Sequence, residues 1–199
     1  MHAYECCVVV VATYLIGSIP FGLIITKCFG LNDIRLIGSH NIGATNVLRT
    51  GHKSLALATV LFDSCKGIIA ALGGCQFGND TASLAAVWVV IGHCFPLWIK
   101  FKGGKGVATA IGVWLALATD IGIIVCLLWL IVASVFRYAS AASLAAIAVA
   151  PLLAWNMGNI EFVQAGIVIV SIIWLRHYHN IRRIIAGCES KIVLHEKKQ

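Results

Sequence analysis

Charged residues are scarce in this sequence. They make up 12% of its 199 residues, whereas a soluble domain has about a quarter. Hydrophobic residues make up 60% of the chain, and its mean hydropathy is +0.92. This composition excludes disorder, and it leaves too little polar surface to cover a water-soluble globule. Most of the surface must face lipid, so we expect an all-α polytopic membrane protein.

Signatures of several common sites are also absent. The eight cysteines include no C-x-x-C pair and no metal-ligand spacing, so we expect packing thiols, no metal and no cofactor. No His is followed five residues later by Asp, which excludes the His-x4-Asp acyltransferase box. There is no G-x-S-x-G motif, which excludes the nucleophile elbow of the α/β-hydrolases.

Long apolar runs dominate what is present. A helix needs about 20 apolar residues to cross about 30 Å of hydrocarbon. Three runs provide that length unaided: 6–26, 81–99 and 139–160. A fourth helix, 54–73, contains Asp63 and Lys66, whose i, i+3 spacing allows them to pair. Unpaired, each charge would cost about 3 kcal/mol at the centre of the bilayer.

The remaining apolar residues leave the number of spans open. Residues 106–136 are interrupted only by Asp120, and they form either one long tilted helix or two short helices with a turn at 118–122. We favour two, because short helices can cross when they pack in a bundle. With 162–175 they predict about seven transmembrane helices, with five as the alternative. We expect one integral-membrane domain, 1–199, with a cytoplasmic tail from about residue 176.

Basic and acidic residues fall on opposite sides of the predicted spans. Apart from Lys66, every cation lies after the first, third or fifth span or in the tail: Lys27, Arg35, Arg49, Lys53, Lys100, Lys102, Lys105, Arg137, Arg176, Arg182, Arg183, Lys191, Lys197 and Lys198. The opposite loops contain the acids Glu5, Asp80, Asp120 and Glu161. The positive-inside rule therefore predicts an outer N-terminus and a cytoplasmic C-terminus.

Acids are rare on the predicted cytoplasmic side, where we find only Asp33, Glu189 and Glu196. A pair of catalytic carboxylates and a protein-bound Mg²⁺ both require acids close together. The sequence therefore argues against both kinds of site.

Three cytoplasmic segments combine cations with glycines and short polar residues. The first, G-S-H-N-I-G-A-T-N-V-L-R, spans Gly38–Arg49. Its backbone N–H groups and short donors are able to surround an oxyanion, and Arg49 adds a planar cation. A polar loop in which Thr45 or Asn46 caps the next helix explains this composition equally well.

The second segment, His93–Thr109, contains K-G-G-K-G at 102–106. It fails the Walker A pattern, because Gly106 stands where Ser or Thr is required and position 99 is not glycine. A glycine turn before a helix starting near Val107 still provides free N–H groups, a positive helix dipole and an ammonium group. We favour anion binding over a simple positive-inside anchor. We expect His93, near a helix end, to be a structural hydrogen-bonding residue.

The third segment, R-H-Y-H-N-I-R-R, spans Arg176–Arg183 directly after the last predicted span. It is either a basic stop-transfer cluster or a polar stripe that points back under the bundle, since Arg176, His177 and Asn180 share a helical face. Periodicity does not choose between these readings. The motif Gly17–Gly22, G-S-I-P-F-G, would suit a loosened helix end, but glycine and proline are common in membrane helices, and we favour that simpler explanation.

In order along the chain, these motifs closely resemble those of the bacterial acyl-phosphate:glycerol-3-phosphate acyltransferase (PlsY) family. The similarity runs from about residue 10 to 190. The strings F-K-G-G-K-G-V-A-T at 101–109 and G-A-T-N-V-L-R at 43–49 are highly specific to it. The resemblance implies a multi-pass enzyme of phospholipid biosynthesis in the bacterial inner membrane, with its active site on the cytoplasmic face. It would move a fatty acyl group from acyl phosphate to the 1-hydroxyl of glycerol 3-phosphate, giving lysophosphatidate and inorganic phosphate.

The resemblance also assigns residues to the two substrates. It places these around the acyl-phosphate head: Ser39, Asn41, Gly43, Ala44, Thr45 and Asn46. It places these around glycerol 3-phosphate: Arg49, Lys105, Ser143, His177 and Asn180. Among these the predicted catalytic residues are Ser39, Asn46, Arg49, Lys105 and His177. The glycine turn described above adds Lys102, Gly103 and Gly104 as predicted substrate-binding residues. The implied partners are acyl phosphate, glycerol 3-phosphate and membrane lipid, with no nucleic acid and no obligatory protein partner.

Two positions depart from the family, which usually has Gly at position 40 and often Pro at 42. Here they are His40 and Ile42. His adopts left-handed backbone conformations more readily than most residues, so we expect the loop to keep its shape.

The implied chemistry suits a chain rich in cations and poor in bases. The leaving phosphate is already an anion, so stabilisation of charge matters more than protonation. Either His177 or the substrate's own phosphate accepts the hydroxyl proton. We hypothesise substrate-assisted transfer, with His177 as a binder.

An anion transporter or channel is the competing hypothesis, because interrupted helices and glycine loops also build permeation sites. Three observations oppose it. The basic groups lie on one face, no internal repeat is evident, and the outer loops contain no cation to receive an anion.

Overall fold

The computed structural model describes residues 3–192, so Glu196, Lys197 and Lys198 of the predicted tail lie outside the described part. Within residues 3–192 the chain forms helices and no strands, which confirms the predicted all-α class. The helices are α1 (Ala3–Gly17), α2 (Phe21–Cys28), η1 (Ile34–Leu36), α3 (Ala44–Leu48), α4 (Lys53–Cys75), α5 (Asn79–Cys94), η2 (Leu97–Ile99), α6 (Val107–Leu117), α7 (Thr119–Phe136), α8 (Ala139–Asn156), α9 (Ile160–Arg176) and α10 (Tyr178–Ile185).

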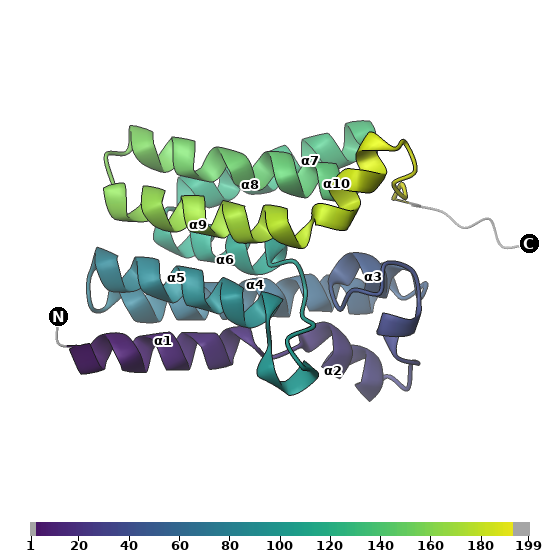
Figure 1. Ribbon diagram of the computed structural model, residues 1–199, viewed down its shortest axis with the longest axis horizontal. Helices are drawn as coiled ribbons and strands as arrows, with labels where there is room; N and C mark the ends of the chain where they lie inside the picture. Colours follow the sequence, from purple (N-terminus) through teal and green to yellow (C-terminus); the bar gives the residue numbers. More distant parts are fainter. Residues whose placement is uncertain (1–2, 193–199) are drawn as a thin grey trace, which may run out of the picture.

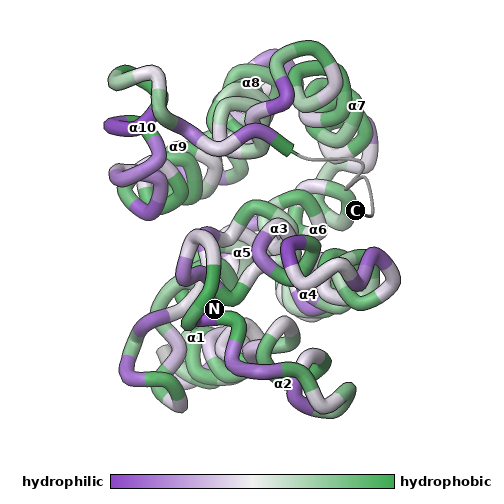
Figure 2. Tube along the Cα trace, turned by 90° about the vertical axis from the view of Figure 1, so that its right-hand side faces the viewer, coloured by the Kyte–Doolittle hydropathy of each residue, from purple (hydrophilic) through white to green (hydrophobic). Residues whose placement is uncertain are grey.

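The long helices lie side by side along the longest axis of the molecule (Figure 1). Helix α1 starts at one end of this bundle. Towards the opposite end lie α2, α3, α10 and, nearer the middle, the loop between α5 and α6. We call this end, made of residues 21–53, 95–106 and 176–192, the basic end. Seen from this end, hydrophilic residues gather in α3, α10 and the adjoining loops (Figure 2).

All seven predicted apolar segments are helical, but they differ in length. Five are long and apolar enough to cross a membrane: Tyr4–Cys28, Lys53–Cys75, Asn79–Ile99, Thr119–Phe136 and Ala139–Asn156. A sixth, α9, passes this test only together with α10, from which it is bent by 63°. The helix α6 has 11 residues. Length and composition thus give five to six crossings, and the count of seven stays a prediction.

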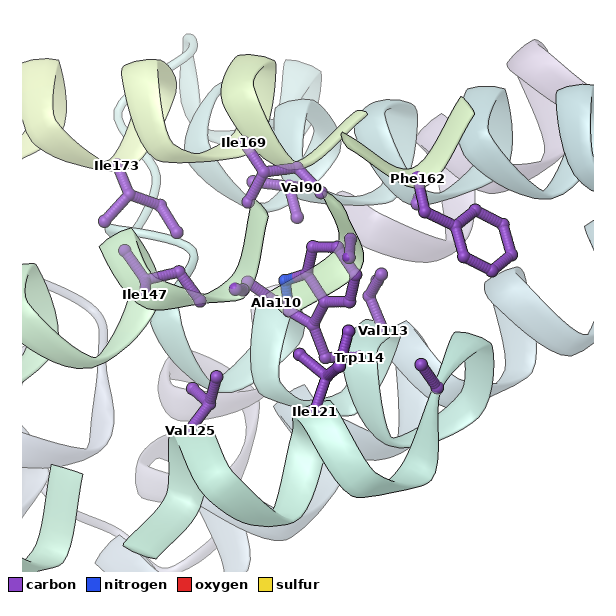
Figure 3. Packing of buried hydrophobic residues seen from close by; sticks show 14 of the residues in the cluster. Val90, Ala110, Val113, Trp114, Ile121, Val125, Ile147, Phe162, Ile169 and Ile173 are labelled. Carbon is purple, nitrogen blue, oxygen red and sulfur yellow. The ribbon is translucent and has the colours of Figure 1, made fainter. Parts of the chain in front are cut away.

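The surface and the core of the bundle are both apolar. Trp114 of α6 is fully buried, and Ile121, Val125 and Ile147 of α7 and α8 pack around it (Figure 3). Large hydrophobic side chains also cover the outside of the long helices, where Val8, Leu61, Leu130 and Leu152 are each more than half exposed. Lipid is the solvent that such a surface requires.

Two glycines allow α4 and α6 to cross in backbone contact. A Cβ on Gly67 would lie 2.1 Å from the Thr109 carbonyl oxygen, and one on Gly112 would lie 2.0 Å from that of Ser64. Small residues at such crossings are the usual means of close helix packing in membranes. This crossing holds the first turn of α6, and therefore the loop that carries Lys105, against α4.

Three breaks interrupt the long helices. The sequence predicts the turn at 118–122, whereas the breaks before α2 and at His177 were not predicted. The chain leaves α1 after Gly17 and starts α2 after Pro20, since proline disfavours helical backbone in the residue before it. Ala118 is extended and separates α6 from α7, which confirms two helices in the 106–136 region. His177 separates α9 from α10.

Candidate active site

The glycine turn between α5 and α6 is held by its own backbone. The Gly103 and Gly104 amides donate to the carbonyl oxygens of Cys94 and His93, at 3.2 and 3.0 Å. The sequence predicts free N–H groups in this turn, and for these two glycines that prediction is wrong, because the end of α5 accepts both. The predicted start of the next helix at Val107 is confirmed. Any contact of Gly103, Gly104 or the exposed Lys102 with substrate stays a prediction.

Arg176 ties the end of α9 to the same turn. Its Nε donates to the Gly104 carbonyl oxygen at 3.0 Å, and its Nη2 donates to that of Gly103 at 2.7 Å. The guanidinium carbon also lies 5.2 Å from the centroid of the Phe95 ring. Arg176 therefore acts as a clamp between the glycine turn and the segment that carries His177.

Lys105 follows the turn and is partly buried among charged groups from three segments. Burial lowers the pKa of Lys105 to about 8, against the influence of the Glu189 carboxylate. The positive charges of Arg183, Arg49 and Arg176 lower the pKa further. The fold thus brings the predicted Arg49 and Lys105 into one electrostatic cluster, with an excess of positive charge.

His177 and Asn180 lie at the bend between α9 and α10, and both side chains are buried. The burial of both side chains favours a polar stripe over a purely stop-transfer cluster, although the break at His177 means that the stripe does not lie on one continuous helix. The His177 Nδ1 lies 2.8 Å from the Ile173 carbonyl oxygen, which only accepts, so Nδ1 carries the proton and Nε2 is the free acceptor. Burial and the nearby Lys105 lower the pKa of His177 to about 4. The imidazole is therefore neutral at pH 7.

Glu189 joins this cluster, although nothing in the sequence pattern singled it out. Its carboxylate accepts hydrogen bonds from Ser140 Oγ at 2.7 Å, Asn180 Nδ2 at 2.6 Å and Arg183 Nε at 2.6 Å, and 7% of the side chain is exposed. Burial would raise the pKa of Glu189, but these donors outweigh it and lower the pKa below its ordinary value. The chain must fold back after α10 to bring Glu189 here, and that turn leaves no strong signal in the sequence.

Ser143 lies one helical turn from Ser140 on α8 and is buried. Its Oγ donates to the Ala139 carbonyl oxygen at 2.7 Å and accepts from the Trp129 indole at 3.0 Å. These bonds fix the orientation of the Ser143 hydroxyl and leave one lone pair of its oxygen free to accept a hydrogen bond. Trp129, on α7, is a neighbour of the predicted site that the sequence did not reveal.

The loop 38–49 is organised around Asn46. The Asn46 amide donates to the carbonyl oxygens of Ile34 and Asn41, at 2.6 and 2.9 Å, and its Oδ1 accepts from the Ser39 backbone amide at 3.1 Å. The side chain of Asn46 is therefore used to shape the loop. A direct contact with substrate stays a prediction for both Ser39 and Asn46.

The capping explanation of this loop is wrong. The helix α3 starts at Ala44 with Gly43 as its N-cap, so Thr45 and Asn46 lie inside α3, and His52 precedes α4. The Gly43 carbonyl oxygen accepts from the amides of Asn46 and Val47. The amides of Ala44 and Thr45 lie outside the intrahelical ladder, as first-turn amides do.

Two side chains of this loop stand out. His40 has φ +55° and its Nδ1 lies 2.8 Å from the Arg35 carbonyl oxygen, so the loop accommodates a residue other than glycine by left-handed backbone, as predicted. The buried Asn41 Oδ1 has no hydrogen-bond partner in the described part of the chain. A buried polar atom of this kind is expected to find a ligand or water.

Gly38 brings Arg49 against the loop. Gly38 has φ +57°, and a Cβ there would lie 2.5 Å from Asn46 Oδ1 and 2.6 Å from Arg49 Nη1. Glycine is required on both counts. The guanidinium of Arg49 consequently packs against Gly38, and its charge acts on Lys105.

Fold and site together define a multi-pass membrane protein with an excess of cations, amides and hydroxyls clustered at one end of the bundle. Comparison with known proteins gives the family. The sequence profile of the glycerol-3-phosphate acyltransferase family matches residues 7–187. The chain belongs to this family.

Individual relatives agree along nearly the whole chain. The glycerol-3-phosphate acyltransferase of Cereibacter sphaeroides is 49% identical over 180 residues, which cover 90% of this chain and 86% of the relative. That of Mesorhizobium japonicum is 47% identical, with 90% and 92% covered. The crystal structure of PlsY, an integral membrane glycerol 3-phosphate acyltransferase, in its glycerol 3-phosphate form superposes with a TM-score of 0.91 at 37% identity and covers 95% of this chain and 96% of PlsY. The lysophosphatidic acid form of PlsY gives a TM-score of 0.88, with 94% and 95% covered.

Proposed function

We propose that the protein is an acyl-phosphate-dependent glycerol-3-phosphate acyltransferase. It moves a fatty acyl group from acyl phosphate to the 1-hydroxyl of sn-glycerol 3-phosphate and releases 1-acyl-glycerol 3-phosphate and inorganic phosphate. Family membership supports glycerol 3-phosphate as the acceptor, since PlsY is described in forms with glycerol 3-phosphate and with lysophosphatidic acid.

One observation carries this proposal: cations from distant segments converge with too few acids to neutralise them. The charges of Arg183, Arg49 and Arg176 all act on Lys105, and among the charges acting on Lys105 in the described part of the chain Glu189 is the one carboxylate. Two phosphorylated substrates would supply the missing negative charge. Arg49, Lys105, Ser143, His177 and Asn180 would hold glycerol 3-phosphate.

The donor follows from what the cluster is able to stabilise. The hydroxyl oxygen forms a bond to the acyl carbon, the bond from that carbon to the phosphate oxygen breaks, and phosphate leaves with the electron pair. Since the leaving group is an anion, fixed cations and N–H groups lower the barrier and a general acid is not needed. The loop residues Asn41, Gly43, Ala44 and Thr45, shaped by Asn46 and Ser39, would surround the acyl-phosphate head.

The hydroxyl proton goes to a substrate phosphate. A phosphate monoester has a second pKa of about 6, whereas burial and Lys105 hold the pKa of His177 at about 4. The phosphate is the stronger base of the two. The free Nε2 of His177 would accept a hydrogen bond from the glycerol, which makes His177 a binder.

The direct test uses the purified protein in detergent with radiolabelled glycerol 3-phosphate and either acyl phosphate or acyl-CoA. We expect labelled lysophosphatidate with acyl phosphate alone. If no donor gives product, the proposed activity is wrong, and if acyl-CoA serves equally well, the assignment of the donor is wrong.

His177→Gln tests the binder role. Gln keeps a hydrogen-bond acceptor, so we expect the KM for glycerol 3-phosphate to rise about tenfold with a smaller change in kcat. Loss of turnover with unchanged affinity for glycerol 3-phosphate would show that His177 is the base.

We further propose that the basic end faces the cytoplasm of a bacterial cell, in the inner membrane. The asymmetry of Lys and Arg supports this orientation. A C-terminal fusion to green fluorescent protein is expected to fluoresce and a fusion to alkaline phosphatase to be inactive. The reverse pattern would place the site outside.

A further inference from the structure

Asp63, Lys66 and His93 form a buried cluster behind the glycine turn. The Lys66 ammonium lies 2.7 Å from Asp63 Oδ1 and 2.9 Å from His93 Nδ1. Each of the three side chains is at most 5% exposed. An ammonium group only donates, so His93 Nδ1 must be the acceptor and Nε2 carries the ring proton. None of the three is among the residues that would touch substrate.

A second hydrogen bond of Lys66 reaches a different element. Its ammonium donates to the Ile19 carbonyl oxygen at 3.0 Å, in the break between α1 and α2. The break before Pro20 leaves that carbonyl outside a regular helix. The two hydrogen bonds of Lys66 therefore connect α4 with the end of α5 and with the break after α1.

His93 connects this cluster to the glycine turn. A Cβ on Gly104 would lie 2.0 Å from His93 Nε2, so the imidazole packs directly against the Gly104 backbone. The His93 carbonyl oxygen also accepts the Gly104 amide at 3.0 Å. From the opposite side, Arg176 binds the Gly104 carbonyl oxygen. Gly104 is therefore held by hydrogen bonds of its amide and its carbonyl oxygen, and by the His93 imidazole that packs where a side chain would lie.

The stability of the fold alone does not explain why charged side chains lie at this position. Replacing a buried ion pair by apolar side chains of similar volume is often neutral for stability, and ionisable groups inside a membrane usually have a functional reason. This cluster fixes the orientation of the His93 ring, which contacts the turn next to Lys105. An apolar pair would not fix that orientation.

We propose that Asp63, Lys66 and His93 are positioning residues that hold the Gly103–Gly104 turn so that Lys105 meets the phosphate of glycerol 3-phosphate. This inference rests on the proposed function, which assigns Lys105 to that phosphate. The cluster acts through the turn and touches neither substrate.

The first test removes both charges at nearly constant volume in the double variant Asp63→Asn/Lys66→Met, with His93→Gln as an independent variant. We expect the KM for glycerol 3-phosphate to rise about tenfold, while kcat and the KM for acyl phosphate change by less than about threefold. Product formation by the wild type in the same assay tests the proposed function separately.

Thr59→Val is the matched control on the same helix. Thr59 is fully buried, and its hydroxyl donates to the Leu55 carbonyl oxygen of its own helix at 2.8 Å. We expect this variant to leave the KM for glycerol 3-phosphate unchanged. A KM that rises equally in Thr59→Val, or that does not rise in the cluster variants, would overturn the proposal. If size-exclusion chromatography shows that the charge variants are not folded, the KM of His93→Gln for glycerol 3-phosphate decides alone.

The second test addresses the contact itself by a double-mutant cycle. Gly104→Ala places a methyl group where the His93 ring lies and is expected to raise the KM for glycerol 3-phosphate about tenfold. His93→Ala removes the ring and makes room. We expect the double variant to be less impaired than the product of the two single effects. Strict multiplication of the two effects would show that the ring does not hold the turn.

Discussion

Two clusters of charged side chains lie near the basic end, and they differ in their balance of charge. In the inner, buried cluster, Lys66 donates to His93 Nδ1 and to the Ile19 carbonyl oxygen, and its charge is balanced by Asp63. In the outer cluster, three arginines and one carboxylate, Glu189, act on Lys105. The inner cluster is balanced in charge without a ligand. The outer cluster carries an excess of positive charge.

This difference separates architecture from function more clearly than composition does. The inner cluster consists of buried ionisable groups, which are costly in a membrane, whereas the outer cluster is partly exposed at the end of the bundle. A balanced cluster stabilises one arrangement of the chain, whereas an unbalanced one is prepared for an anion. Variants of the two clusters should therefore fail in different ways.

The largest effect is expected from Lys105→Ala, which removes the central cation of the outer cluster. Initial rates should fall by at least about 100-fold, because the substrate phosphate loses its charged partner in a site poor in water. The protein should still be expressed and should melt at nearly the wild-type temperature. Lys53→Ala, at the exposed start of α4, is the control and should keep full activity. Retention of most of the activity by Lys105→Ala would remove the distinction between the clusters.

The inner cluster should respond in the opposite way. The single change Lys66→Met leaves Asp63 buried without a cation, and the loss of one partner of a buried pair costs about 3–5 kcal/mol. The melting temperature in detergent should drop clearly, while Asp63→Asn/Lys66→Met should recover much of the loss. A Lys66→Met protein as stable as the wild type would show that the pair is not a buried ion pair.

A smaller effect, graded with pH, should come from the titration of Lys105. Burial holds the pKa of Lys105 at about 8, with Glu189 opposing and Arg183, Arg49 and Arg176 adding to the decrease. The protonated form, present below this pKa, binds phosphate, so kcat/KM for glycerol 3-phosphate should fall as pH rises through about 8. In Lys105→Arg any remaining activity should lack this alkaline decrease, since guanidinium stays charged. The same decrease in Lys105→Arg would assign it to another group.

The smallest effect is expected at the edge of the outer cluster. Trp129→Phe removes the indole that donates to Ser143 Oγ and keeps an aromatic ring in place. The hydroxyl becomes freer to turn, so the KM for glycerol 3-phosphate should rise about twofold to threefold. An unchanged KM in steady-state kinetics would mean that Ser143 needs no support from α7.

The features that the sequence predicts well are those with a local cause. Apolar runs identified the helices, and the i, i+3 spacing paired Asp63 with Lys66. The break before α2 was not predicted, because glycine and proline are also common within membrane helices. The site residues that lie within motifs could be predicted as one group, because the motifs lie at the same end of the bundle.

What the sequence did not predict depends on distant parts of the chain. Glu189 reaches Ser140 across 49 residues, and Arg176 reaches Gly103 across 73. No spacing rule connects such positions. The amides of Gly103 and Gly104 were expected to be free, but the end of α5 binds them, which a motif read along one segment does not show.

The most direct test of the account measures both products of the same reaction. Purified protein in lipid vesicles is supplied with acyl phosphate and glycerol 3-phosphate, and lysophosphatidate and inorganic phosphate are quantified together. The account predicts equal amounts of the two, with formation of both dependent on glycerol 3-phosphate and nearly abolished in Lys105→Ala. Phosphate released without lysophosphatidate, or anion passage across the vesicle without either product, would contradict it.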